Sequence, residues 1–385
     1  MVTEHTIVDL FCGCGGFGLG AELAGFRSIV GIDIDSTLQS AYKMNFPNSR
    51  VFASDISKMD ESTWRLILNT TKIDGVIGGP PCQGYSRMGL SNENDPRRSL
   101  IKDFFRTVNI IYPKFFIMEN VEGLLDKKNK KELDNALSIL NKDYKVLEPM
   151  ILDASNYGAP TKRKRVIVVG YLPQHFIALN RENFTNSKFQ YITVKDAIYD
   201  LGKPVPQAKD ISNYGWGKYR KLKKISNYAL EMRKSPPQGI GNDLFINKMN
   251  EGIVSGFYDT THAPNIIERY LELEPGKIDT ISKSKKLQWN GFCPTLRAGT
   301  GADKGSFQAV RPIHPQQGRV ITVREAARLQ GFPDWFGFHH TKWHSFRMIG
   351  NSVSPIFSKA LLSIIKENII SENTAITKLE ENTNA

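Results

Sequence analysis

Cysteine is scarce in this sequence and long apolar runs are missing, and each shortage excludes a class of protein. Four cysteines (Cys12, Cys14, Cys82 and Cys293) are too few for the disulfide framework of a small secreted protein. Cys12 and Cys14 lie too close together for an easy disulfide, and no second Cys/His pair completes a zinc site. We therefore expect a reduced, intracellular protein that needs no metal.

Membrane and export signals are also missing. No apolar run approaches the roughly 20 residues that a membrane helix needs. Glu4 and Asp9 carry charge where a signal peptide would be uncharged and apolar. These two absences predict a cytoplasmic protein without a membrane partner.

Acidic residues are few in one late part of the chain, so the positive charge is unevenly distributed. The net charge is +12 over 385 residues, and residues 201–350 hold 23 Lys and Arg against 12 Asp and Glu. A localised basic surface is typical of proteins that bind a polyanion. The alternative is a mildly basic soluble protein without such a partner.

The first 170 residues alternate short apolar runs with segments of helical period. Strands alternating with helices predict an α/β fold with a mostly parallel, doubly wound sheet. Ligands bind such sheets at the carboxyl ends of the strands. The predicted strands are Thr6–Phe11, Ser28–Asp33, Arg50–Ala53, Gly75–Ile77, Lys114–Glu119, Lys145–Leu152 and Arg165–Tyr171. The predicted helices are Phe17–Ala24, Thr37–Asn45, Glu61–Leu68, Leu100–Ile111 and Gly123–Leu140.

The pattern changes after about Gln174. Residues 174–318 have weak periodicity and many Lys, Asn, Gly, Pro and Tyr residues, and they hold most of the basic excess. Helical period returns at Thr322–Gln330 and Ser354–Ile365, on either side of a turn at 350–352. We expect a first domain at 1–174 that is completed by 345–370, and a smaller second domain at 175–335. Residues 336–344 would form a hinge and 371–385 a frayed polar tail.

A glycine-rich loop follows the first predicted strand. Gly13, Gly15 and Gly18 fit the GxGxxG pattern, in which glycines let the backbone turn tightly and approach a ligand closely. The pattern fits a nicotinamide, a flavin or a sulfonium nucleoside equally well. A tight turn between strand and helix that binds no ligand is the alternative.

Two acids lie at or just past the ends of the next two predicted strands. Asp33 lies about 20 residues beyond the glycines, the interval at which a carboxylate accepts hydrogen bonds from the hydroxyls of a ribose. Asp55 could accept a hydrogen bond from an adenine amino group. For each acid the alternative is a helix cap or a solvated loop residue.

The loop Gly78–Ser86 carries a candidate nucleophile. Pro80 and Pro81 stiffen the backbone just before Cys82 and fix where it points. A cysteine on a rigid loop over a ligand site is a candidate nucleophile if its surroundings favour the thiolate. A lone cysteine is more often a small buried residue, but Gln83 and the two prolines make the nucleophile the better interpretation.

Charged residues also border two later strands. Glu119 ends a wholly apolar strand, where a carboxylate is costly to bury without a partner. Arg163 and Arg165 would share one face of an extended segment and could hold a base carbonyl oxygen and a phosphate. The alternatives are a helix-capping acid and a solvated basic loop.

Together these segments resemble the DNA (cytosine-5)-methyltransferase family, above all the single-chain bacterial enzymes of restriction–modification systems. Nine motifs stand in the family's order, which is far more specific than any one of them. They are the glycine loop at 9–20, the acid Asp33, Asp55-Ile56, Pro80–Gln83, Asp95–Leu100, Glu119–Val121, the pair Arg163/Arg165, Val323–Pro333 and Gly350–Val353.

The resemblance implies a Rossmann-like fold that binds S-adenosylmethionine, with a smaller target-recognition domain. It implies Cys82, Glu119, Arg165 and Arg163 as catalytic residues, and Gln83, Ser86, Thr295 and Arg297 as contacts to DNA. The implied cofactor-binding residues are Phe11, Gly13, Cys14, Gly16, Asp33, Ile34, Asp55, Ile56, Gly79, Leu100, Asn351 and Val353. No metal is implied.

The chain departs from the family pattern at two positions. Ile34 stands where the family usually has an aromatic residue that stacks on adenine, so cofactor affinity could differ. Thr161 stands where the family often has Gln, which puts one backbone or DNA contact in doubt but leaves the chemistry intact.

The resemblance also implies a partner and a place in the cell. The partner would be double-stranded DNA, in which the target cytosine must be flipped out of the stack. A cognate restriction endonuclease acting on the same site and a bacterial cytoplasmic location are further expectations, with a monomer as the default.

Three other functions compete with this interpretation. A tRNA cytosine-5 methyltransferase would carry the same motifs, although the basic domain before residue 319 favours duplex DNA. An inactive DNA-binding relative is disfavoured because Cys82, Glu119 and Arg165 are all present. A nicotinamide oxidoreductase would explain the glycine loop alone.

Overall fold

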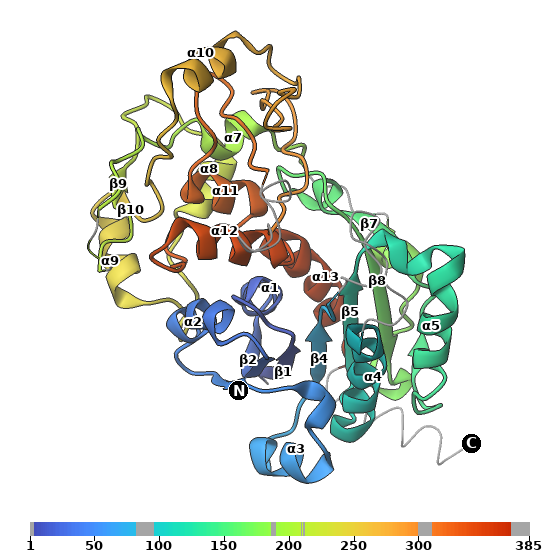
Figure 1. Cartoon of the computed structure of the whole chain (residues 1–385). Helices are drawn as coiled ribbons and strands as arrows, with labels where there is room; N and C mark the ends of the chain where they lie inside the picture. Colours follow the sequence, from blue (N-terminus) through green and yellow to red (C-terminus); the bar gives the residue numbers. More distant parts are fainter. Residues whose placement is uncertain are drawn as a thin grey trace.

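One mixed sheet organises the first half of the chain (Figure 1). The structure is a computed structural model that describes residues 4–81, 96–185, 190–208, 210, 212–298 and 310–370. The strand order is β3-β2-β1-β4-β5-β8-β6, and β7 also pairs with β8. The strands are β1 (His5–Leu10), β2 (Phe26–Asp33), β3 (Arg50–Ala53), β4 (Gly75–Gly78), β5 (Phe115–Asn120), β6 (Lys145–Val146), β7 (Met150–Asp153) and β8 (Lys164–Tyr171).

The pairing confirms the predicted doubly wound sheet. Strands β1 to β5 pair in parallel, whereas β8 runs antiparallel to β5, β6 and β7. The single strand predicted at Lys145–Leu152 is wrong, because the structure has two strands there. Pro149 lies in the break and cannot donate a hydrogen bond to β8.

Helices cover both faces of the sheet, which explains why its central strands are largely apolar. Successive strand residues point to opposite faces. Ile7, Ile77 and Ile117 therefore pack toward α1 (Gly16–Leu23) and α13 (Pro355–Asn368). Val8, Val76 and Phe116 face the opposite layer. That layer is made of α3 (Glu61–Leu68), α4 (Leu100–Ile111) and α5 (Lys127–Leu137).

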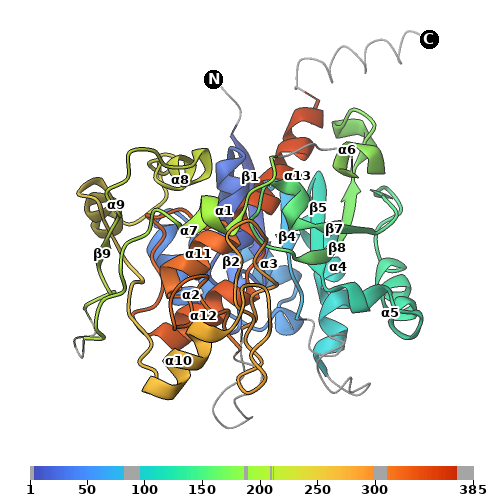
Figure 2. The ribbon, with the colours of Figure 1, turned by 90° about the horizontal axis from the view of Figure 1, so that it is seen from above.

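The second half of the chain forms a smaller, loop-rich region, which lies to one side of the sheet in Figure 2. Its strands β9 (Gly217–Lys218) and β10 (Ile253–Val254) form a short antiparallel pair. Its helices are short, as the weak periodicity predicts. They are α7 (Val194–Ile198), α8 (Asn227–Met232), α9 (Asp243–Asn250), α10 (Pro264–Glu272) and α11 (Val323–Gln330). Helix α6 (Arg181–Thr185) lies instead beside α13, and its Phe184 belongs to the core of the sheet domain.

The smaller region shares a hydrophobic core with the sheet domain. Tyr42 and Phe46 of α2 (Ser36–Asn45) belong to the same buried cluster as Phe332 and Phe336. The buried amide of Asn45 also donates to the carbonyl oxygen of Gly337 and accepts from its N–H, at 2.8 and 2.9 Å. The two regions are therefore packed together at the segment that we expect to act as a hinge.

The helix α12 (Lys342–Asn351) is the main element that the sequence does not predict. Its Trp, His, Ser and Gly residues have ordinary or low helix propensity, so packing against α11 and α2 has to stabilise it. The first turn of α12 lies within the expected hinge at 336–344. The expected tail at 371–385 lies outside the described residues.

One segment is an exception to the expected lack of apolar runs of membrane-spanning length. Residues 342–368 include an 18-residue stretch apolar enough to cross a membrane. That stretch is divided between α12 and α13 by a break at Ser352–Ser354, and 72% of it is buried inside the protein. It therefore forms part of the core.

Candidate functional site

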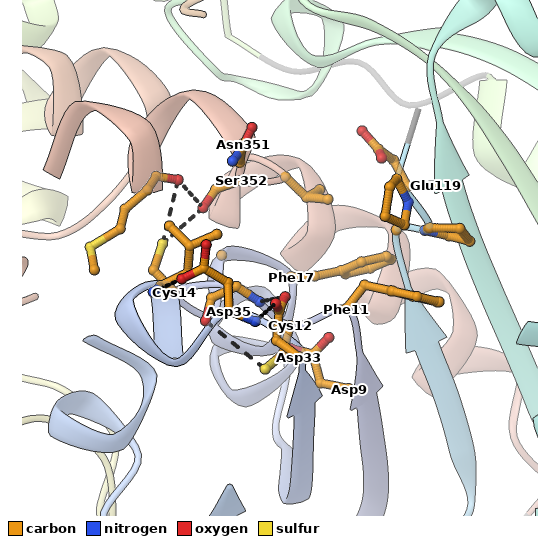
Figure 3. A pocket seen from close by; sticks show the side chains of 18 of the residues that line it. Asp9, Phe11, Cys12, Cys14, Phe17, Asp33, Asp35, Glu119, Asn351 and Ser352 are labelled. Atoms are coloured by element: carbon orange, nitrogen blue, oxygen red, sulfur yellow. Dashed lines mark hydrogen bonds between the residues drawn. The ribbon is translucent and has the colours of Figure 1, made fainter. Parts of the chain in front are cut away.

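A cavity of about 400 Å³ lies at the carboxyl ends of β1, β2, β4 and β5, where a doubly wound sheet binds its ligands (Figure 3). Its volume is within the range of small-molecule sites. All twelve predicted cofactor-binding residues line it, together with Glu119, Arg163 and Arg165. The glycine loop, the two acidic strand ends and the segment around Asn351 therefore converge, although they are far apart in the sequence.

The glycine loop is shaped by residues with positive φ. Phe11 and Gly13 have φ of +56° and +52°, and Gly15 has +96°. A Cβ on Gly15 would lie 2.5 Å from the Phe46 ring, so that glycine is required by packing. A Cβ on Gly13 would meet no atom within 4 Å. The space beside Gly13 is open to the cavity, so a ligand can approach the backbone there.

The carboxylate of Asp33 braces this loop. It accepts hydrogen bonds from the N–H of Gly13 at 2.9 Å and from the N–H of Asp35 at 2.8 Å. Burial raises the pKa of Asp33, and these two hydrogen bonds partly oppose that effect. Each carboxylate oxygen keeps a second lone pair, which remains available to a ligand hydroxyl.

Asp9 is a buried acid of the cavity wall that the sequence does not single out as a ligand contact. One of its carboxylate oxygens accepts a hydrogen bond from the N–H of Gly18 at 3.0 Å. The other has no hydrogen-bond partner among the described residues. Burial raises the pKa of Asp9 well above its ordinary value. The glycine spacing explains the first contact, because it brings the start of α1 onto Asp9.

The outer part of the cavity combines an apolar surface with charged groups. The Ile34 side chain is 72% exposed. Beside it, the carboxylate of Asp35 pairs with the guanidinium of Arg347 at 2.6 Å, which joins α2 to α12. Sequence reasoning missed both partners, because the helix that carries Arg347 was not predicted.

Asp55 caps a short helix and also lines the cavity. Its carboxylate accepts from the N–H of Ser57 at 3.0 Å and so caps the short helix Ile56–Lys58. It also lines the cavity, as do Ile56 and Leu100. The helix-cap interpretation is therefore confirmed, and the same carboxylate also lies at the edge of the cavity.

The segment after α12 closes the cavity against the glycine loop. A Cβ on Gly16 would lie 2.4 Å from the carbonyl oxygen of Val353. The Cys14 thiol and the Ser352 hydroxyl form a hydrogen bond of 2.9 Å. Burial raises the pKa of Cys14 to about 12, which keeps this thiol protonated. Asn351 and Val353 are held in the wall by these contacts.

An ion pair marks the other end of the cavity. Nε of Arg165 lies 2.7 Å from Oε1 of Glu119, and both side chains are nearly buried. The burial of Glu119 is therefore compensated by a partner, as the sequence analysis requires. Asn120 donates a hydrogen bond to the carbonyl oxygen of Pro80 at 3.2 Å, which ties the start of the Pro-Pro segment to β5. Cys82, Gln83 and Ser86 lie outside the described residues.

Arg163 differs from Arg165 in its surroundings. Both line the cavity, but the Arg163 side chain is buried, and its guanidinium donates to the carbonyl oxygens of Leu296 and Gly350. Thr295 and Arg297, on either side of Leu296, are exposed. The Thr295 hydroxyl donates to the carbonyl oxygen of Lys162 at 2.7 Å.

Comparison with protein families matches residues 5–367 to the family described as C-5 cytosine-specific DNA methylase. The chain is 38% identical to the Type II methyltransferase M.XorII of Xanthomonas oryzae, over 94% of this chain and 84% of that protein. It is 34% identical to the Type II methyltransferase M.DdeI of Desulfomicrobium norvegicum, over 94% of this chain and 89% of that protein.

Solved structures show the same arrangement. A DNA modification methyltransferase encoded within an Escherichia coli prophage superposes with a TM-score of 0.84 at 38% identity, covering 94% of this chain and 99% of that one. The S. pombe Dnmt2 methyltransferase superposes with a TM-score of 0.58 at 18% identity, over 94% of this chain and 99% of that one, a likeness of fold.

Proposed function

This chain belongs to the C-5 cytosine-specific DNA methylase family, and from this premise we propose how its residues methylate DNA. The activity is that of a DNA (cytosine-5)-methyltransferase. The proposed reaction transfers the methyl group of S-adenosylmethionine to carbon 5 of a flipped-out cytosine in a specific duplex site. The observation that carries the proposal is one cavity that joins a nucleoside-sized pocket to the Glu119–Arg165 pair.

The residues of the cavity suit S-adenosylmethionine. Asp33 offers carboxylate oxygens to the ribose hydroxyls, and Asp55 offers one to the adenine amino group. Ile34 supplies apolar surface for the adenine ring, and the open space beside Gly13 admits the ligand close to the backbone. Phe11, Asn351 and Val353 complete the wall. When bound, the cofactor supplies an electrophilic methyl group.

The cytosine ring needs activation because carbon 5 is a poor nucleophile. The Cys82 thiolate would add to carbon 6, which moves an electron pair toward carbon 5. The other three cysteines, which the structure describes, are buried with raised pKa values, and this suits them to packing rather than attack. After carbon 5 has taken the methyl group, loss of the carbon-5 proton to a base would restore the ring double bond and let Cys82 leave.

The Glu119–Arg165 pair would stabilise the ring during this attack. Glu119 would hold ring nitrogen 3 and read the exocyclic amine, while Arg165 would bind the oxygen at position 2, where negative charge builds up. The 2.7 Å ion pair holds both groups in place before the base arrives, so little reorganisation is needed. Asn120 would contribute by fixing Pro80, two residues before Cys82.

The smaller region would read the DNA. We assign residues 1–174 and 345–370 to the catalytic domain, 175–335 to target recognition and 336–344 to a hinge. The packing of α13 against α1 supports the inclusion of the C-terminal helix in the catalytic domain. Gln83, Ser86, Thr295 and Arg297 would contact the DNA, and basic residues around them would bind phosphates.

In the cell the enzyme would protect host DNA as part of a restriction–modification system, with a cognate endonuclease that cuts the same site. The Type II methyltransferases that the chain resembles support this role. We expect a monomer in the bacterial cytoplasm.

The proposal is tested by incubating the protein with methyl-labelled S-adenosylmethionine and either duplex DNA or tRNA, beside a Cys82→Ala variant. Label in DNA that the variant fails to transfer supports the proposal, and conversion sequencing of that DNA then gives the recognised site. Label in tRNA alone would mean that the substrate is RNA and not duplex DNA. Label in DNA that persists in the variant would exclude Cys82 as nucleophile.

A further inference from the structure

The contacts around Arg163 differ from those of a residue that reads a base. Residues 293–298, which we name the linking segment, leave the smaller region and run beside the start of β8. The N–H of Cys293 donates to the carbonyl of Pro160, and the N–H of Lys162 donates to the carbonyl of Cys293, both at 2.9 Å. Thr161 and Cys293 form a parallel bridge. The linking segment is thus paired to the sheet domain.

Arg163 extends this pairing to a third element. Its guanidinium donates to the carbonyl of Leu296 in the linking segment at 3.3 Å and to the carbonyl of Gly350 in α12 at 3.2 Å. The Arg163 side chain is 4% exposed, and these two backbone carbonyls are among the partners of its buried charge. A charged donor in a buried place is costly to leave unpaired, so these two contacts link the linking segment to α12.

Gly350 confirms how close the two segments lie. A Cβ at this position would be 2.4 Å from the backbone nitrogen of Ala298 and 2.4 Å from the carbonyl carbon of Arg297. The next residues, 351–353, form the cofactor wall described above. One backbone contact therefore separates the exposed Arg297 from that wall.

We infer that Arg163 is a positioning residue that couples DNA contact by the linking segment to cofactor binding. This inference rests on the proposed function. A shift of the linking segment when DNA binds is passed through Leu296, Arg163 and Gly350 to the wall at 351–353. Because coupling between two ligands is reciprocal, the cofactor strengthens DNA binding by the same factor.

The test measures S-adenosylhomocysteine affinity by calorimetry, with and without a duplex oligonucleotide carrying the methylated site. In the unchanged protein we expect the duplex to tighten binding at least about fivefold. In Arg163→Ala the affinity without DNA falls about tenfold, and the effect of the duplex disappears. Arg163→Lys recovers part of the affinity, because one ammonium cannot span both carbonyls.

Arg27→Ala is the matched control. It also removes an arginine, but one whose ion pair with Glu4 is exposed at the start of β2, far from the cavity. We expect its affinity and its coupling to equal those of the unchanged protein.

Gly350→Ala tests the same link without removing a charge. It remains informative even if Arg163→Ala fails to fold. Its Cβ must push the linking segment away from α12, so we expect the same loss of coupling. Unchanged coupling in Gly350→Ala would overturn the inference. So would an Arg163→Ala protein that keeps its coupling and loses only turnover, because Arg163 would then act on the base.

The failure of the proposed function would look different. In that case the unchanged protein would not label DNA at all. An active protein without coupling between DNA and S-adenosylhomocysteine would refute the inference alone.

Discussion

At the scale of single residues, Gly13 shows how an absent side chain makes room for a ligand. Gly13 has a φ of +52° and open space where a Cβ would be, and it lies in the cavity wall. Gly252 has a φ of +77° and equally open space, but it follows α9 and does not line the cavity. The two glycines therefore share a left-handed backbone conformation, and only the open space beside Gly13 belongs to the cavity.

We expect Gly13→Ala to weaken S-adenosylhomocysteine binding about tenfold or more, because its Cβ enters the space that the ligand needs. Its stability should fall by about 1–2 kcal/mol, the usual cost of a left-handed conformation for a residue with a Cβ. Calorimetry gives the affinity, and denaturant unfolding gives the stability.

Gly252→Ala is the control for backbone strain. It should show a similar loss of stability with unchanged affinity. Equal affinities in the two variants would mean that the ligand does not approach the backbone at Gly13.

At the scale of elements, α11 is held by buried charge as well as by apolar packing. Arg328 is fully buried, and its guanidinium lies 2.6 Å from each carboxylate oxygen of Asp334 and 3.2 Å from Asp200. Arg324 is also fully buried and donates to the carbonyls of Ser255, Pro333 and Phe336. These contacts gather several loops of the smaller region onto one helix.

We expect Arg328→Met to cost about 3–5 kcal/mol of unfolding free energy, because it removes the fully buried cation that contacts both Asp334 and Asp200. Arg233→Met is a suitable comparison, since Arg233 also pairs with Asp200 but is partly exposed. Its cost should be much smaller. Urea unfolding of both variants measures the difference, and equal costs would show that burial does not set the strength of these pairs.

The histidine beside α11 should make the protein sensitive to mild acid. Burial lowers the pKa of His314 to about 4 from an ordinary 6.5, against the opposing effect of Glu325. Between these two pKa values, His314 is protonated in the unfolded chain but not in the folded protein. The free energy of unfolding therefore falls as pH falls from 6.5 toward 4. Nδ1 of His314 accepts from the N–H groups of Gln316 and Gln317.

We expect His314→Asn, which keeps an acceptor near Nδ1, to lose less stability over this range than the unchanged protein, by about 2 kcal/mol. Thermal unfolding measured in steps from pH 7.5 to 4.5 gives both curves. Parallel curves would mean that other groups carry the acid sensitivity.

At the scale of the whole molecule, the core joins the two regions into one folding unit. Tyr42 and Phe46 of the sheet domain share a buried cluster with Phe332, Trp335 and Phe336. Trp64 lies in a separate cluster under the sheet. Neither region can unfold alone without exposing the shared cluster, which favours a single cooperative transition.

We expect urea unfolding followed by far-ultraviolet circular dichroism and by tryptophan fluorescence to coincide. S-adenosylhomocysteine should shift both curves together, because it binds only the folded protein. Trp64→Phe and Trp335→Phe each remove one reporter, and the remaining signal should keep the same midpoint once each variant's own stability is allowed for. Two separate transitions would show that the smaller region folds independently.

Much of the fold follows from local sequence, whereas most of the predicted site residues follow from the resemblance to a family. Alternating apolar runs place β1 to β5 and α1 to α4 within a few residues of their observed bounds. All twelve predicted cofactor-binding residues line the cavity. Those that follow β1 to β4 meet there because parallel strands bring their carboxyl ends to one edge, whereas helix packing brings Leu100, Asn351 and Val353 to it. The contacts of Cys82, Gln83 and Ser86 lie outside the described residues and stay predictions.

Patterns of neighbouring residues are enough to predict the alternation of strands and helices, and nine motifs in order are enough to predict the family and its reactive residue types. Tertiary structure alone decided that α12 forms, that Arg347 meets Asp35, and that Arg163 is held by Leu296 and Gly350. These contacts join residues more than 100 positions apart. No local period or propensity records such pairs, because their free energy arises only when the two regions pack together.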